Sequence, residues 1–129
     1  MSTDPYSGRT LAFLGDAVWS LIVRKWLIEQ GEGSGKVLQA KAAAFVSAKA
    51  QASFYDLLHE EGFLSEAEEE AYRHGRNAHA GTVPHNTPVL VYRKSTGFEA
   101  MIGMLYLDEQ WERIEAIWKE IGKQTEMNP

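Results

Sequence analysis

Two acidic residues stand beside glycines in otherwise apolar, helix-forming stretches. Asp16 directly follows Gly15, and Glu99 lies four residues before Gly103. An adjacent Gly and Asp lower the helix propensity of a segment, Gly by about 1 kcal/mol relative to Ala, and a carboxylate among apolar residues is costly unless a cation or donor pairs with it. If the two carboxylates converge, they form a hard-oxygen site of the kind that holds Mg²⁺ with several waters and a substrate phosphate.

A structural interpretation of both acids is also open at this point. Asp16 could form an ion pair with an arginine such as Arg24 or Arg93, and Glu99 could favour the N-terminal end of its helix, where the helix dipole stabilises negative charge. Two unaligned carboxylates are a weak motif, so their spacing alone does not decide. The neighbouring glycines leave room for a water, a metal ion or a closely packed helix.

A cationic segment follows an acidic one. The net charge of −5 would argue against a nucleic-acid partner if it were evenly spread, but residues 59–70 hold six glutamates and residues 71–98 hold no Asp or Glu. The second segment contains Arg76, Arg93 and Lys94, so it could present a local phosphate-binding surface on an acidic protein. The alternative is a solvated loop that happens to lack acids.

Helical periodicity of apolar residues runs through almost the whole chain, which predicts an all-α fold. Ser65 and Glu68 form a capping-box pattern, and Gly75 is a plausible C-terminal stop. Residues 89–92 are read as extended or as a helical turn within a long connection over 75–93, since a lone strand would have no partner. The predicted helices cover residues 9–30, 36–61, 65–74, a segment capped by Ser95 or Thr96, and 109–123.

Length and composition limit the class of protein. A chain of 129 residues with 44% hydrophobic residues fits one compact domain. The chain has no cysteine, which excludes disulfides, thiolate metal sites and a cysteine nucleophile and suits a reducing cytoplasm. No apolar run is long enough to span a membrane, and Met1 to Arg9 show no signal sequence. We therefore expect a soluble, cytoplasmic, single-domain protein.

Several motifs, in order, resemble a known family. Residues 11–18 (LAFLGDAV) look like the signature helix of the ribonuclease III family, and residues 95–103 (STGFEAMIG) look like its second catalytic helix. Residues 46–52 (VSAKAQA), 75–78 (GRNA) and 81–84 (GTVP) resemble the short subfamily called Mini-ribonuclease III. The resemblance covers about residues 9–121.

The resemblance implies a ribonuclease III-type endonuclease catalytic domain that is helical and dimeric. It implies a homodimer that cleaves double-stranded RNA with Mg²⁺, Mn²⁺ being a substitute, and leaves 5′-phosphates. The subfamily is associated with maturing the ends of 23S ribosomal RNA precursor, on which ribosomal proteins are bound. The subfamily lacks a double-stranded-RNA-binding domain, so we expect a single catalytic domain over 1–129 that itself binds the RNA.

The resemblance also assigns site residues. Asp16 and Glu99 carry over as catalytic residues and metal ligands. Full-length relatives have a Glu where this chain has Ala12 and an Asp where it has Thr96, which leaves the number of bound metal ions open. The short subfamily shares both differences, so they do not indicate an inactive protein.

RNA contacts are assigned from charge and motif position. Arg76, Arg93 and Lys94 would bind phosphates, and Asn77 could hydrogen-bond a 2′-hydroxyl or a base edge in the shallow groove. Alternatively, Arg93 or Lys94 could pair locally and Asn77 could fix its own loop through a backbone bond.

Two other function classes compete with the nuclease hypothesis. The first is a non-catalytic RNA-binding or ribosome-assembly module on the same fold, and the second is a structural helical dimer whose acids form salt bridges. The presence of both Asp16 and Glu99 favours the nuclease, because a module that only binds RNA has no need for acids that repel phosphate.

Overall fold

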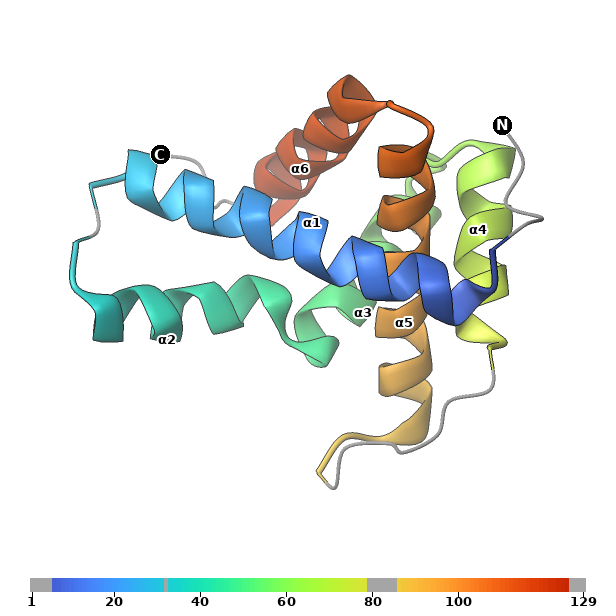
Figure 1. The fold of residues 1–129 in the computed structure, drawn as a ribbon, viewed down its shortest axis with the longest axis horizontal. Helices are drawn as coiled ribbons and strands as arrows, with labels where there is room; N and C mark the ends of the chain where they lie inside the picture. Colours follow the sequence, from blue (N-terminus) through green and yellow to red (C-terminus); the bar gives the residue numbers. More distant parts are fainter. Residues whose placement is uncertain (1–5, 32, 79–85, 126–129) are drawn as a thin grey trace.

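The computed structural model describes residues 6–31, 33–78 and 86–125, and within these ranges it contains six α-helices and no strand (Figure 1). The all-α prediction is confirmed. No helix in the described ranges is long and apolar enough to cross a membrane. The helices are α1 (Gly8–Glu29), α2 (Gly35–Val46), α3 (Ala48–Glu60), α4 (Glu66–Arg76), α5 (Val89–Leu107) and α6 (Trp111–Thr125).

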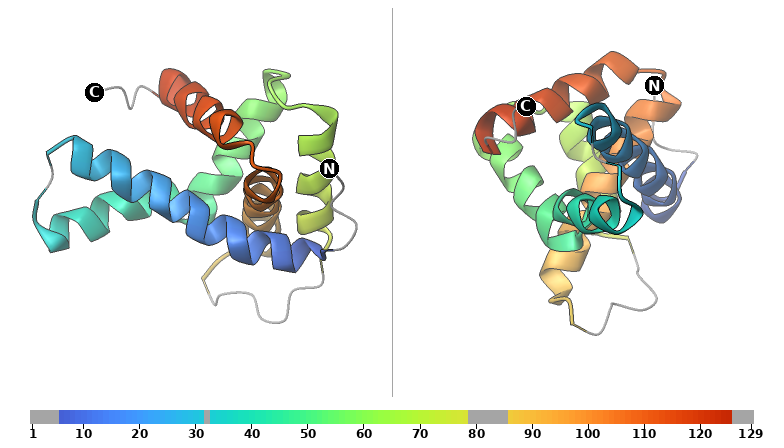
Figure 2. Two further views of the ribbon diagram at one scale, coloured as in Figure 1. Left: turned by 45° about the horizontal axis from the view of Figure 1, so that its top comes forward. Right: turned by 90° about the vertical axis from the view of Figure 1, so that its left-hand side faces the viewer.

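Helix α5 forms the centre of the domain. It contacts α1, α3, α4 and α6, and α1 crosses it at a steep angle (Figures 1 and 2). Helix α2 returns alongside α1, so that these two helices form a hairpin that extends away from the other four. The crossing of α1 over α5 therefore sets the relation between the two segments that carry the candidate catalytic acids.

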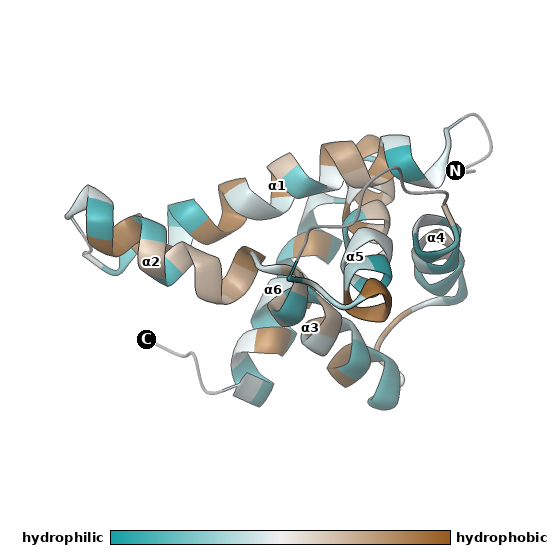
Figure 3. Ribbon diagram, turned by 90° about the horizontal axis from the view of Figure 1, so that it is seen from below, coloured by the Kyte–Doolittle hydropathy of each residue, from teal (hydrophilic) through white to brown (hydrophobic). Residues whose placement is uncertain are grey.

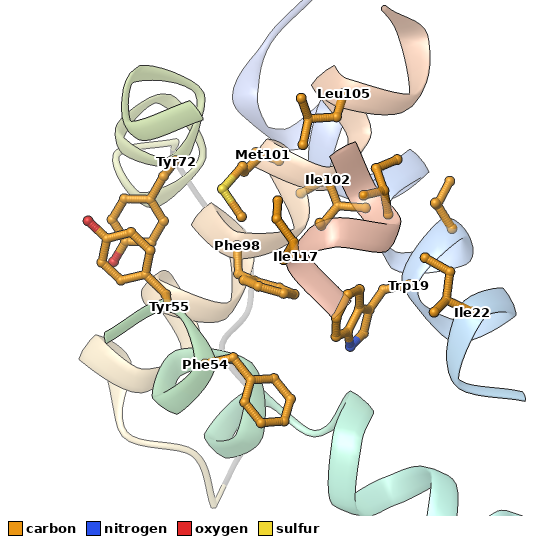
Figure 4. Close-up of a cluster of buried hydrophobic side chains, with 14 of the residues drawn as sticks. Trp19, Ile22, Phe54, Tyr55, Tyr72, Phe98, Met101, Ile102, Leu105 and Ile117 are labelled. Carbon is orange, nitrogen blue, oxygen red and sulfur yellow. The ribbon is translucent and has the colours of Figure 1, made fainter. Parts of the chain in front are cut away.

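The core around α5 combines aromatic rings with aliphatic side chains (Figure 4). The rings of Trp19 and Phe98 meet edge to face, with centroids 4.9 Å apart, a favoured geometry for aromatic pairs. Tyr55 stacks on Tyr72 with ring centroids 3.4 Å apart, which joins α3 to α4. Helix α4 is hydrophilic along most of its length (Figure 3), so a few buried residues attach it to the core.

The two glycines beside the candidate acids lie at the crossing of α1 and α5. A Cβ atom on Gly15 would collide with the backbone carbonyl oxygen of Glu99, and one on Gly103 would collide with that of Leu11. The helix backbones therefore touch, which only glycine permits. Of the three roles considered for these glycines, the close approach of a helix is the one observed.

The predicted helix over 36–61 is wrong in one respect, because it is broken at Ser47 into α2 and α3. Ser47 has an extended backbone (φ −66°, ψ 156°), and its side chain accepts a hydrogen bond from the Ala50 amide. It thus caps the start of α3, as serine commonly does. The apolar period continues across the break because both helices bury a face against the same core.

The helix predicted to begin at Ser95 or Thr96 begins at Val89, directly after Pro88. Residues 89–92 are thus the first helical turn, one of the two readings considered. The Ser95 and Thr96 hydroxyls each donate a 3.0 Å hydrogen bond to the Tyr92 carbonyl oxygen within the helix. These residues bond backward along the helix instead of capping it. Pro88 is the N-cap, and its carbonyl oxygen accepts a 3.0 Å hydrogen bond from the Tyr92 amide.

Helix α4 also extends further than predicted, because it runs through Gly75 to Arg76. The predicted stop at Gly75 is therefore wrong. A Cβ atom at this position would collide with the Ala100 side chain, so the glycine serves close packing of α4 on α5. The capping box at the start of α4 is confirmed, with Ser65 and Glu68 hydrogen-bonded reciprocally.

Glu68 is a buried carboxylate with a cation partner. Its side chain accepts bonds from Arg113 Nε and Nη2 at 2.6 and 2.8 Å and from the Ser65 amide at 2.8 Å. Burial raises the pKa of Glu68, but the bonds from Arg113 and Ser65 outweigh it, and the net pKa is lowered. This pair connects α4 to α6 and is structural.

Candidate active site

A pocket of about 250 Å³ opens where α1, α4 and α5 meet. Both candidate catalytic acids line it, Asp16 from α1 and Glu99 from the middle of α5. Its full lining in the described residues is Arg9, Ala12, Phe13, Asp16, Gly75, Arg76, Ala78, Tyr92, Arg93, Thr96 and Glu99. The fold thus brings together the two sequence segments that were assigned a shared chemistry.

The two carboxyl groups line the same pocket, and Asp16 influences the ionisation of Glu99. Burial and the neighbouring Asp16 carboxyl raise the pKa of Glu99 to about 8, although a hydrogen bond from Gln51 opposes the rise. Close like charges disfavour double ionisation unless a cation or a shared proton compensates. The arrangement is therefore suited to holding a positive charge between the two acids.

Asp16 is exposed, not buried among apolar residues as its sequence neighbours suggested. The reason is its position on α1: Val18 and Trp19 face the core, whereas Asp16 shares the outer face with Phe13, whose side chain is 84% exposed. This places the Asp16 carboxylate at the opening of the pocket and Glu99 deeper within it.

Both structural explanations for the acids fail. No ion pair joins Asp16 to Arg24 or Arg93, two residues that the structure describes. Glu99 lies far from the N-terminal end of α5, which begins at Val89, so the helix dipole does not account for it. Neither structural role suggested by the sequence therefore explains the two acids.

The donor set fits a hard divalent cation. Two carboxylates are enough for Mg²⁺, which keeps several waters and takes substrate phosphate oxygens as further ligands. The described residues contain no cluster of three or more His, Cys, Asp or Glu side chains that could form a closed metal cage. Ala12 and Thr96, the positions where longer relatives carry acids, line the same pocket and supply no carboxylate.

Gln51 contacts this pair, and the sequence analysis did not single it out. Its side chain is 1% exposed, and Nε2 donates a 3.2 Å hydrogen bond to Glu99 Oε2. Its place in the VSAKAQA motif was the sole signal.

Arginine side chains surround the acids. Arg76 lines the pocket, with its guanidinium 5.8 Å from the centre of the Tyr72 ring, a cation–π distance. Its Nε donates to Asn77 Oδ1 at 3.3 Å, so these two predicted RNA-contact residues lie together, although Asn77 itself does not line the pocket. Arg9 was not predicted; it lies two helical turns before Asp16, and that spacing is a signal that could have found it.

The other two predicted RNA-contact residues, Arg93 and Lys94, have different surroundings. Arg93 is exposed and lines the pocket. Lys94 does not line it, and its Nζ lies 2.9 and 3.1 Å from the two carboxylate oxygens of Asp56 on α3. This is the local pairing that was the alternative for Lys94. Residues 81–84 of the GTVP motif lie outside the described residues.

Comparisons with known proteins identify the family of the chain. The model of the Ribonuclease III domain matches residues 9–110. The chain is 46% identical over 111 residues to a Mini-ribonuclease 3 from Streptococcus pneumoniae (86% of this chain, 87% of the relative). It is 40% identical over 124 residues to a Mini-ribonuclease 3 from Enterococcus faecalis (93% and 94%).

A solved structure shows the same fold. A crystal structure of a protein from Fusobacterium nucleatum superposes with a TM-score of 0.83 at 33% identity, covering 93% of this chain and 94% of that one. The matched domain contains Asp16, Glu99 and the arginines of the pocket. The chain therefore belongs to the ribonuclease III family, and within it to the mini-ribonuclease III group.

Proposed function

We propose that this protein is a Mg²⁺-dependent endoribonuclease, that Asp16 and Glu99 are its catalytic metal ligands, and that it processes precursor 23S ribosomal RNA. Membership of the ribonuclease III family supports the coarser activity, cleavage of double-stranded RNA. The observation that carries the assignment of the site is the pair of adjacent carboxylates in a pocket bordered by Arg9, Arg76 and Arg93.

Each part of the pocket has a chemical role in this proposal. Bound Mg²⁺ would activate a water and neutralise charge on the scissile phosphate. Asp16 and Glu99 would hold the cation through their carboxylate oxygens. The arginines bind phosphates on either side of the scissile bond, which supplies affinity and orientation. The reaction then leaves a 5′-phosphate and a 3′-hydroxyl.

We further propose that the active form is a homodimer. Helix α1 exposes Phe13 (84%), Leu21 (57%) and Ile28 (63%), three large apolar side chains spaced along one helix, and an exposed apolar strip of this kind is typical of an interface. Phe13 also lines the pocket. A second copy of the chain on this face would place two active sites close together, one for each strand of the duplex.

Resemblance to the mini-ribonuclease III group supports the natural substrate. We propose the double-stranded ends of 23S ribosomal RNA precursor in the bacterial cytoplasm, with ribosomal proteins on the precursor as further contacts. Within this domain, the arginines that line the pocket would supply affinity for the RNA phosphates.

A cleavage assay tests the proposal. Purified protein is incubated with a long double-stranded RNA, with Mg²⁺ or with EDTA, beside the Glu99→Gln variant as a control for contaminating nuclease. Cutting that requires both Mg²⁺ and Glu99 is the expected result. RNA binding without cutting, on this RNA and on 23S precursor, would overturn the proposal in favour of a binding module.

A further inference from the structure

Gln51 is one of three polar or charged residues that are buried in the described part of the chain. The others are Glu68, which Arg113 neutralises, and Ser95, whose hydroxyl donates to its own helix. Gln51 differs from both, because its amide reaches across from α3 to a candidate metal ligand on α5. A buried polar side chain that spans two helices to one carboxylate oxygen is a specific arrangement.

The break at Ser47 fixes the position of Gln51. The Gln51 backbone amide donates to the Ser47 carbonyl oxygen at 3.0 Å, in the first turn of α3. Had α2 continued unbroken, residue 51 would lie on the axis of α2 and not on that of α3. The serine cap that the sequence analysis missed is thus also what directs Gln51 toward the pocket.

The hydrogen bond has two consequences for Glu99. It engages Oε2, so the carboxylate cannot rotate freely and the other oxygen, Oε1, takes no part in the bond. It also favours the ionised carboxylate, because an amide N–H can donate to that form. Both effects prepare a ligand for a cation, and partners of this kind commonly tune metal affinity.

We propose that Gln51 is a positioning residue that holds the Glu99 carboxylate in its metal-binding orientation. The inference rests on the proposed function, because it requires Glu99 to be a metal ligand. Gln51 acts through Glu99 and does not contact RNA. Its loss should therefore weaken cation binding and lower kcat, while the KM for RNA stays near that of the unaltered protein.

Two variants separate this role from simple packing. Gln51→Met keeps the length and approximate volume of the side chain and removes the donor, and Gln51→Leu removes the donor with a shorter, branched side chain. Mn²⁺ binding is measured by electron paramagnetic resonance without RNA, and kcat and KM are measured with Mg²⁺. We expect each variant to bind Mn²⁺ about 10- to 100-fold more weakly and to lose a similar factor in kcat.

Tyr55→Phe is the matched control. It lies one turn further along α3 and removes a 2.7 Å hydrogen bond from the tyrosine hydroxyl to Glu69, a carboxylate outside the pocket. It should leave Mn²⁺ affinity and kcat unchanged. Circular dichroism checks that each variant is folded, and if Gln51→Met does not fold, Gln51→Leu decides the question.

The outcomes distinguish the two proposals. If Glu99→Gln cleaves RNA as well as the unaltered protein, the proposed function fails. If Glu99→Gln is inactive but a folded Gln51 variant keeps its Mn²⁺ affinity and kcat, the positioning role alone is overturned. A rise in KM at constant kcat would likewise overturn it, because that result would indicate an RNA contact.

Discussion

Glu68 and Glu99 are two shielded glutamates with opposite surroundings. Glu68 is 3% exposed and faces Arg113, and its pKa is lowered. Glu99 faces Asp16, and its pKa is raised to about 8. The first has its charge matched within the protein, whereas the second lies beside another acid. A half-buried carboxylate that lies beside another acid and forms no ion pair within the described residues indicates a site that is completed by a cation from outside.

The largest expected effect is a loss of cleavage rate when an acid of the pocket is replaced. Glu99→Gln and Asp16→Asn should each lower the rate of RNA cleavage by at least about 1,000-fold, because loss of a metal ligand removes several kcal/mol of stabilisation from the transition state. The rate is measured on double-stranded RNA with Mg²⁺. Cleavage within tenfold of the unaltered rate would show that the residue is not a ligand.

Replacing the arginine partner of Glu68 should instead lower the stability of the fold. Arg113→Met leaves Glu68 buried without its cation, and we expect unfolding in urea to become easier by about 3 kcal/mol. Cleavage per folded molecule should be unchanged. Lys25→Met removes an exposed ion pair with Glu29 and serves as the control, with an expected effect under about 0.5 kcal/mol. If the two variants lowered the free energy of unfolding equally, the structural role assigned to the Glu68–Arg113 pair would be contradicted.

The two acids should also give opposite dependences of stability on pH. Glu99 keeps its proton up to about pH 8 when folded, but an unfolded glutamate releases it near pH 4.5. The folded state therefore binds more protons between these values, and stability without metal should fall by about 3.5 kcal/mol from pH 5 to pH 8. Glu68, whose pKa is lowered, stabilises the fold at neutral pH and loses this effect only in acid.

Thermal unfolding without metal measures this dependence. Glu99→Gln should abolish most of the decline between pH 5 and pH 8, and Arg113→Met should leave it in place. Added Mg²⁺ should raise the Tm of the unaltered protein at pH 8 and not that of Glu99→Gln. An unchanged pH profile in Glu99→Gln would show that this glutamate is not the group responsible.

The smallest expected effects distinguish the two cations of the RNA surface. In the inactive Glu99→Gln background, Arg76→Gln should weaken RNA binding about tenfold and reduce the salt dependence by about one released ion. Lys94→Gln should change affinity less than about twofold, because Asp56 already pairs with the ammonium group. A larger effect of Lys94→Gln would mean that this pair opens when RNA binds.

The sequence predicted the helical class, the ends of α1 and α6 to within two residues, and the partnership of Asp16 and Glu99. These features follow from period and motif, which are local or recognisable by resemblance. The break at Ser47 was missed because apolar period continues through it. The start of α5 was missed because Ser95 has the residue type of a cap but not its position.

The finer composition of the site depends on side chains from distant segments. Gln51 has no apolar neighbour pattern that would predict burial, and its partner lies 48 residues away. Arg93 and Lys94 are adjacent in sequence and have the same charge, yet consecutive helical residues point in different directions. One lines the pocket and the other pairs with α3. Such differences depend on helix packing, which charge patterns do not describe.

The contact between Gly15 and Gly103 makes the distance between the two acids a property of the main chain. Rotamer changes cannot restore that distance if the helices separate, so the site comes into existence only when α1 docks on α5. During refolding, recovery of cleavage would then require this docking and lag behind the recovery of helical circular dichroism. Cleavage activity can therefore be used to follow the docking of α1 on α5 during folding.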